Sequence, residues 1–171
     1  PITDLNMGQT AEILAHLFDV SRRDADAYAV ESHRRLGEAT AKGWLKGEML
    51  PAVARDGKAY DHDDGIRPGT TVKDLAKLRP VFERPYGKVT PGNASQITDG
   101  ASWNILASEA AVEKYGLKPL ARIVDSDWGG LDPSIMGVGP ISASRKALEK
   151  AGWSVDDLDL VEANEAFAAQ A

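Results

Sequence analysis

The sequence predicts an α/β protein, and three observations lead to this fold class. Residues 7–42 carry apolar side chains at helical spacing. After Gly92, apolar runs of strand type alternate with helical segments, which favours parallel strands covered by helices. The last such run precedes Asn164-Glu165-Ala166-Phe167, so a neutral amide stands at a predicted strand-to-helix junction, where dipoles can be directed at a substrate. The 171 residues suffice for one domain or for parts of two.

The first sixty residues predict two helices and an edge strand. Residues 7–18 have the apolar spacing of a first helix. Ser21 caps a second helix, which runs to about Lys42. Residues 48–55 alternate weakly and predict an edge strand, and Asp56-Gly57 after it is a hairpin-type turn.

The rest of the chain predicts a long loop followed by alternating strands and helices. Residues 60–91 are interrupted by glycine and proline and contain one short helix at 72–78, and a loop of this length usually serves a function. The predicted strands span 101–107, 120–124 and 158–163, the predicted helices span 108–115 and 141–151, and a helix of small residues begins after Asn164.

Composition narrows the classes of partner. The chain has 20 basic and 26 acidic residues, and its net charge of −6 argues against nucleic acid as the main partner. No apolar run approaches the roughly 20 residues that span a bilayer, and the first residues do not resemble a signal peptide, so no membrane association is expected. The absence of cysteine excludes disulfides, thiolate metal sites and a cysteine nucleophile within this chain. It also fits a reducing compartment, and we expect a cytoplasmic protein.

One stretch of this acidic chain is basic. Residues 67–88 contain six basic side chains against two acidic ones. A basic segment on an acidic protein suits a small polyanion such as a nucleotide-tailed cofactor. A solvated basic loop explains the same composition equally well.

Two further motifs imitate ligand sites without meeting their requirements. Residues 137–142 resemble a dinucleotide-binding loop, but Ser142 replaces its last glycine and Pro140 removes a phosphate-facing amide. Residues 61–65 resemble a calcium loop, but the glycine comes one position early and Val72 occupies the place of the required glutamate. The three histidines stand on separate elements, so we expect no metal site.

Residues 90–95, Thr-Pro-Gly-Asn-Ala-Ser, form a second candidate binding loop. Their small side chains allow a ligand to approach the backbone closely, and Asn93 and Ser95 offer hydrogen bonds. A tight turn before a strand is an equally good explanation.

Together these residues resemble the thiolase family. The resemblance rests on an ordered series along the whole chain: 7–12 (MGQTAE), 66–71 (IRPGTT), 75–82 (LAKLRPVF), 89–95 (VTPGNAS), 99–101 (DGA), 119–123 (PLARI), 136–140 (MGVGP) and 164–167 (NEAF). One such stretch would be weak, whereas the ordered series is specific. It indicates the middle part of a thiolase, less than half of a usual family member.

The resemblance implies a fold and a division into domains. In the family, two similar α/β halves stack into a layered α-β-α-β-α fold, and a loop domain grows from the first half and holds coenzyme A. This chain would be a partial copy of that fold. Residues 1–92 would belong to the loop (CoA-binding) domain, residues 93–118 to the end of the N-terminal half and residues 119–171 to the start of the C-terminal half.

The resemblance also implies a reaction. It is reversible Claisen chemistry, in which a cysteine thiolate cleaves a 3-ketoacyl-CoA or, in reverse, two acyl-CoA units condense. Both directions develop an oxyanion on a thioester oxygen, so preorganised hydrogen-bond donors matter. Asn164 matches the family asparagine that holds an oxyanion-stabilising water, and an amide can orient water without a charge of its own.

The remaining site residues follow from the same resemblance. Arg67 resembles the arginine beside the CoA nucleotide, and Ser95 resembles the serine that bonds the pantetheine arm. Met7, Met136 and Phe167 match apolar residues around the acyl and pantetheine thiol end, although core packing alone explains Met7 equally well. Coenzyme A and acyl-CoA would then be substrates, with no permanently bound cofactor.

The sequence departs from the family pattern at the reacting groups. The family's nucleophilic cysteine, acid/base cysteine and Gly-His-Pro histidine are not present, so we expect this chain alone to be inactive. The parent would be a homo-oligomeric transferase (dimer or tetramer) of fatty-acid β-oxidation or of acetoacetyl-CoA formation. Asn6 stands where biosynthetic relatives often have histidine, which leaves the subfamily open. The alternative function is a non-catalytic CoA-binding or assembly module derived from a thiolase.

Overall fold

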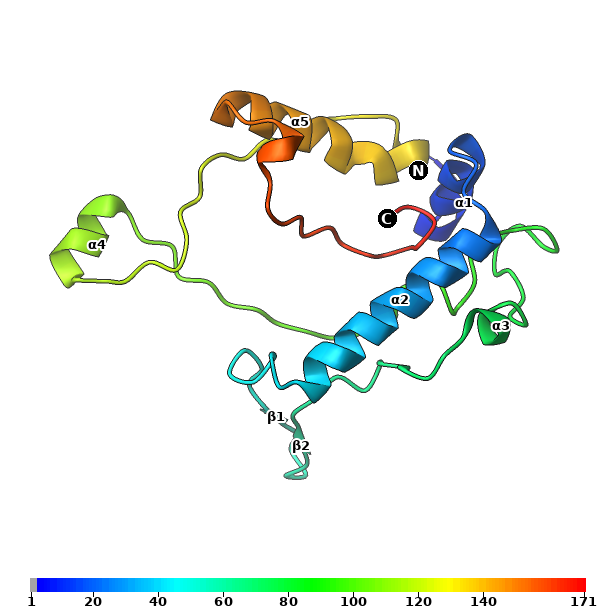
Figure 1. Ribbon diagram of the computed structural model, residues 1–171, viewed down its shortest axis with the longest axis horizontal. Coiled ribbons are helices and arrows are strands. Elements are labelled where there is room, and N and C mark those ends of the chain that lie inside the picture. The colour runs from blue at the N-terminus through cyan, green and yellow to red at the C-terminus, as the bar shows by residue number, and fades with distance from the viewer. Residues whose placement is uncertain (1–2) are drawn as a thin grey trace. The chain divides into compact units, whose positions relative to one another are not determined.

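The fold is known from a computed structural model of the chain, which describes residues 3–171 (Figure 1). The helices are α1 (Met7–Leu17), α2 (Arg22–Ala41), α3 (Val72–Leu75), α4 (Glu109–Tyr115) and α5 (Gly139–Ala151); the strands are β1 (Ala52–Val53) and β2 (Ala59–Tyr60); two 3-10 helices span Pro133–Val138 and Val155–Asp157. The chain divides into two compact units. The first contains the residues up to Gln96 together with 133–137 and 163–171, and the second contains 97–132 and 138–162.

The two predicted N-terminal helices are confirmed, and both begin at polar caps. At α1, Asn6 Oδ1 accepts from the Gln9 N–H at 3.0 Å, and Gln9 Oε1 accepts from the Asn6 N–H at 2.9 Å. At α2, Ser21 Oγ accepts from the Asp24 N–H at 3.1 Å. The caps satisfy amides that have no partner within the helix. The Ser21 cap was predicted, whereas the start of α1 was predicted from apolar spacing alone.

The edge strand predicted at 48–55 is much shorter in the structure. Only Ala52–Val53 forms β1, which pairs antiparallel with β2. Gly57, with φ +82°, makes the predicted hairpin turn, in a conformation that glycine adopts without steric cost. All four strand residues are exposed, so this hairpin stands outside the core.

The core of the first unit joins α1, the loop around Val89 and the C-terminal residues. Its buried members are Ala11, Ala15, Val89 and Ala169, with Val20, Phe82, Ala94 and Phe167 packed against them. An isolated antiparallel bridge pairs Ala94 with Phe167. The C-terminal residues, red in Figure 1, therefore run beside α1.

The second unit contains α4 and α5, and both predicted helices are confirmed. Ser108 Oγ caps α4 by accepting from the Ala111 N–H at 3.2 Å. Pro140 lies in the first turn of α5, where its missing N–H costs nothing. Gly116 and Gly152 end the two helices in the left-handed conformation, the usual glycine stop signal.

The three strands predicted at 101–107, 120–124 and 158–163 are wrong. These segments are neither helix nor strand in the structure, and their apolar side chains face solvent, with Ile105 95% and Leu120 104% exposed. A strand needs a neighbour that pairs with its backbone, and nothing within residues 3–171 pairs with these segments.

Two predicted helices are also corrected. The helix predicted at 72–78 is limited to α3, and the helix predicted after Asn164 is replaced by a turn, in which the Gln170 and Ala171 amides donate to the Phe167 carbonyl at 2.9 and 3.1 Å. Among the described helices, none combines the length and apolar character needed to cross a membrane.

Candidate functional site

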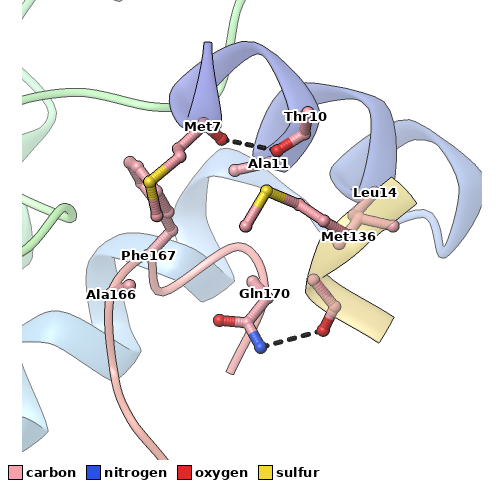
Figure 2. Close-up of a pocket in the computed structure, with 9 residues that line it drawn as sticks. Met7, Thr10, Ala11, Leu14, Met136, Ala166, Phe167 and Gln170 are labelled. Atoms are coloured by element: carbon pink, nitrogen blue, oxygen red, sulfur yellow. Dashed lines mark hydrogen bonds between the residues drawn. The ribbon is translucent and has the colours of Figure 1, made fainter. Parts of the chain in front are cut away.

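An apolar hollow opens between α1 and the last residues of the chain (Figure 2). It contains about 280 Å³ of space, part of it open to solvent. The lining residues are Met7, Thr10, Ala11, Leu14, Met136, Gly137, Ala166, Phe167 and Gln170. Three predicted binding residues, Met7, Met136 and Phe167, thus line one hollow although they come from distant parts of the sequence.

Hydrogen bonds fix the walls of the hollow. Gln170 Nε2 donates to the Gly137 carbonyl at 3.1 Å, which ties residues 133–137 to the C-terminal turn. Figure 2 shows the Met7 and Phe167 side chains next to each other, with Met136 reaching in toward them. Met7 is 54% and Met136 43% exposed, so two flexible thioethers are available to adapt to a slender apolar ligand.

Neither Asn164 nor Ser95 lines this hollow, but both are connected to Ala166, which does. Asn164 stands two residues before Ala166, and the Ser95 N–H donates to the Ala166 carbonyl at 2.8 Å. Both side chains are exposed, and neither forms a hydrogen bond with residues 3–171. A carboxamide and a hydroxyl are therefore free to bond a ligand or a water.

The residue after Asn164 is anchored to α2. Tyr28 Oη donates to Glu165 Oε1 at 2.8 Å, and Ser32 Oγ donates to Glu165 Oε2 at 2.5 Å. The hydrogen bond to this carboxylate is the first cause that raises the pKa of Tyr28, followed by burial and the charge of Glu165. Asn164 thus precedes a fixed point of the C-terminal segment.

Arg67 lies on the exposed loop that precedes α3 and does not line the hollow. Its N–H donates to His33 Nδ1 at 3.2 Å, and its Nη1 donates to the Asp64 carbonyl at 3.0 Å. The basic stretch that contains Arg67 is partly engaged within the fold, since Lys88 Nζ donates to the Ala15 carbonyl at 2.8 Å. Arg67 itself keeps an exposed guanidinium.

One group of potential metal ligands occurs among the described residues. Donor atoms of Glu12, His16 and Glu83 lie within 4.8 Å of one another. His16 Nε2 is 2.8 Å from Glu83 Oε2, and both oxygens of the buried Glu12 already accept backbone amides, from Lys88 at 2.7 Å and from Val89 at 2.9 Å. The arrangement is explained by these internal bonds.

The sequence did not reveal a network of buried polar side chains beside the hollow. Glu12, Asp26, Thr90 and Asn93 are all at most 4% exposed. Asn93 was expected to offer hydrogen bonds to a ligand, but its side chain is bonded inside the protein, to Asp26 Oδ1 and to the Lys88 carbonyl, both at 2.9 Å. Their residue types are typical of surfaces, so only the fold reveals their burial.

Comparison with known proteins identifies the class. Sequence profiles of the thiolase N-terminal and C-terminal domains match residues 2–110 and 117–171, and the chain therefore belongs to the thiolase family. It is 46% identical to a β-ketothiolase of Cupriavidus necator over 100% of this chain and 44% of the relative. It is 50% identical to an acetyl-CoA acetyltransferase of Shinella zoogloeoides over 97% of this chain and 43% of the relative.

Solved structures confirm a thiolase-like fold in partial copy. Human mitochondrial 3-ketoacyl-CoA thiolase in complex with CoA matches with a TM-score of 0.92 and 48% identity, over 97% of this chain and 42% of that one. The dimeric peroxisomal thiolase of Saccharomyces cerevisiae matches with a TM-score of 0.93 and 40% identity, over the same shares of the two chains. The chain thus spans less than half the length of these relatives.

Proposed function

We propose that this chain is a segment of a CoA-dependent acyltransferase of the thiolase type, whose parent cleaves 3-ketoacyl-CoA or condenses acyl-CoA units. The observation that carries the proposal is the hollow lined by Met7, Met136 and Phe167. The unpaired carboxamide of Asn164 stands two residues before Ala166, which also lines it. Relatives named β-ketothiolase and acetyl-CoA acetyltransferase support the same chemistry.

Each proposed residue has a chemical role that suits its setting. The apolar hollow would receive the thiol or acyl end of the ligand. The Asn164 N–H groups would hold a water against the thioester oxygen, where negative charge develops during the reaction. The Ser95 hydroxyl would bond the pantetheine arm, and the exposed Arg67 would pair with the anionic nucleotide.

The wider setting of the parent protein is proposed on the same basis. Coenzyme A and acyl-CoA are its substrates, without a permanently bound cofactor, and neither nucleic acid nor a membrane is a partner. A homo-oligomer is supported by the dimeric yeast relative. The division into a loop domain and parts of two halves at 92 and 118 is proposed from the resemblance. A cytoplasmic location stays a prediction from sequence, and the solved relatives are described as mitochondrial and peroxisomal.

The chain by itself is proposed to be inactive, because its 171 residues contain no cysteine thiol to attack a thioester. The test is to titrate coenzyme A into the purified chain by calorimetry and to assay thiolysis of acetoacetyl-CoA through loss of its enolate absorbance. We expect micromolar binding and no turnover. Clear turnover would refute the cysteine requirement, and no binding would refute the assigned hollow.

Two methionines provide a matched pair of variants. Met136 lines the hollow and is 43% exposed, whereas Met49 is 40% exposed and lies outside it. Met136→Gln is expected to weaken CoA binding about tenfold, because a polar amide replaces the apolar wall. Met49→Gln is expected to leave it unchanged, and an equal loss in both variants would contradict the location of the site.

The second candidate function is a non-catalytic CoA-binding or assembly module. The absence of cysteine and the exposed apolar segments of the second unit favour it. The two functions are separated by mixing the purified chain with separate polypeptides that contain the parts of a full-length thiolase that this chain does not cover. Turnover in the mixture supports the enzyme segment, and CoA binding without turnover in the same mixture supports the module.

A further inference from the structure

The side chain of Asn93 links α2 to the loop at residues 88–90. Its Nδ2 donates to Asp26 Oδ1 on α2 and to the Lys88 carbonyl, both at 2.9 Å, and its Oδ1 accepts from the Thr90 N–H at 2.8 Å. The amide orientation is fixed, because acceptors face its nitrogen and a donor faces its oxygen. Because Asn93 is only 3% exposed, water does not replace a hydrogen-bond partner that its side chain loses.

Asp26 extends this network to the end of α3. The Arg22 Nε lies 2.9 Å from both Asp26 oxygens, and Arg22 Nη2 donates to the Leu75 and Leu78 carbonyls at 2.6 and 3.2 Å. A carboxylate that is 1% exposed needs such a cation, since an unpaired buried charge is very costly. The position of Asn93 is therefore set by α2 and α3 together.

Two backbone hydrogen bonds connect residues 93–95 to the C-terminal residues that line the hollow. The Asn93 carbonyl accepts from the Ala168 N–H at 2.9 Å, and the Ser95 N–H donates to the Ala166 carbonyl at 2.8 Å. These two bonds form the isolated bridge around Phe167. An isolated bridge has no ladder to support it, so it depends on how firmly its two chains are held.

We propose that Asn93 and Asp26 are positioning residues of the thioester site, which fix residues 93–95 against 166–168 and thereby place Phe167 in the hollow and Asn164 beside it. The inference rests on the proposed function. Neither residue touches the hollow, and each acts through the bridge.

The test uses a double-mutant cycle in the full chain. Asn93→Asp keeps the shape but turns both donations into repulsions, toward Asp26 and the Lys88 carbonyl. We expect amide exchange at Ser95 and Ala168 to become about tenfold faster and CoA affinity to fall about tenfold. Asp26→Asn added to Asn93→Asp restores a donor opposite the new carboxylate, so the double variant should recover part of both losses.

A neighbouring side chain of the same loop supplies the control. Gln96 Nε2 donates to the Gly65 carbonyl at 3.0 Å and takes no part in the bridge, so Gln96→Ala should change neither readout. If Asn93→Asp loses its helical circular dichroism, amide exchange and CoA affinity are measured on Asp26→Asn alone. This variant still offers Arg22 an oxygen acceptor, and it should show the same two losses.

The outcomes separate the two proposals. Faster exchange with unchanged CoA affinity would overturn the positioning role while leaving the proposed function intact. Failure of the unaltered chain to bind CoA would refute the proposed function, whereas the exchange measurement would still test the bridge. Purely additive losses in the double variant would also overturn the inference, because a general structural defect gives no recovery.

Discussion

At the scale of single residues, Glu165 accepts hydrogen bonds from two hydroxyl groups of α2, and one of these bonds changes the pKa of its donor, Tyr28. The hydrogen bond from Tyr28 to Glu165, ahead of burial and the carboxylate charge, raises the pKa of Tyr28 above 10.0. Since the folded pKa is the higher one, the interaction stabilises the fold at every pH below the ordinary value. It is lost as the pH rises through the folded pKa.

Glu165→Gln is accordingly expected to return the pKa of Tyr28 toward its ordinary value. A neutral amide accepts a weaker hydrogen bond from the phenol than a carboxylate does, and it does not repel a phenolate. The measurement is an NMR titration of isotope-labelled tyrosine. Glu162→Gln removes a nearby carboxylate in the sequence without touching Tyr28 and should leave its titration unchanged. A Tyr28 titration that stays the same in Glu165→Gln would disprove the anchoring of the C-terminal segment.

Substitution of Gly137 tests how tightly the wall of the hollow is packed. A Cβ atom at this position would lie 2.5 Å from Leu14 Cδ1 and 2.7 Å from Gln170 Cγ. Gly137→Ala is expected to lower the free energy of unfolding by about 1–3 kcal/mol, because overpacking displaces both side chains. Gly69 has open space around it, so Gly69→Ala should preserve or slightly raise stability. Urea titrations of the two variants make the comparison, and equal stabilities would show that the wall is loosely packed.

At the scale of elements, the single turn α3 depends on its capping box. Thr71 Oγ1 donates to Asp74 Oδ2 at 2.5 Å and accepts from the Asp74 N–H at 3.3 Å. The Thr71 hydroxyl, ahead of Lys77, lowers the pKa of Asp74 from 3.8 to about 2. Because the folded pKa is the lower one, the cap's contribution is present above pH 3.8 and is lost as the pH falls through about 2.

Thr71→Ala is expected to raise the pKa of Asp74 and to expose the α3 amides to exchange, since the main partner of the carboxylate is gone. An NMR titration of the Asp74 carboxyl measures the first effect. Ser154→Ala removes a similar cap from the 3-10 helix Val155–Asp157 and should leave Asp74 unaffected. An unchanged Asp74 titration in Thr71→Ala would assign the low pKa to Lys77 instead.

The elements also show which parts of this fold can be predicted from sequence. Helices were found because their signals are local: Ser21 and Ser108 bond amides three residues away, and Gly116 and Gly152 adopt the left-handed stop. Strands were mispredicted because an apolar run such as 101–107 states only that a side chain tends to be buried. Whether it forms a strand is decided by a partner elsewhere in the chain.

The candidate site divides in the same way. Met7, Met136 and Phe167 were predicted as binding residues from motif resemblance, and the structure brings them to one hollow, while their role in binding stays a prediction. Asp26 and Asn93 were not recognised as buried, because an isolated Asp or Asn in a sequence looks like a surface residue. Asp26 pairs with Arg22 and bonds Asn93 across 67 positions of the sequence, and no local pattern encodes this long-range contact.

At the scale of the whole molecule, apolar side chains fall into two environments. Val89 is 1% exposed in the core of the first unit, whereas Val161 is 71% exposed in a segment whose sequence predicts a strand. Unpaired backbone and exposed apolar side chains promote association with other chains. The chain also spans only 42–44% of the length of its relatives, which supports partners for these segments outside the described residues.

A pair of isosteric substitutions tests this division. Val89→Thr places a hydroxyl in the core and should lower the free energy of unfolding by about 1–3 kcal/mol, since the buried hydroxyl loses its hydrogen bonds to water and gains no partner positioned to replace them. Val161→Thr should change it by less than about 0.5 kcal/mol and should reduce concentration-dependent association, measured by sedimentation. If Val161→Thr destabilises the chain as much as Val89→Thr does, residues 158–163 are packed in solution.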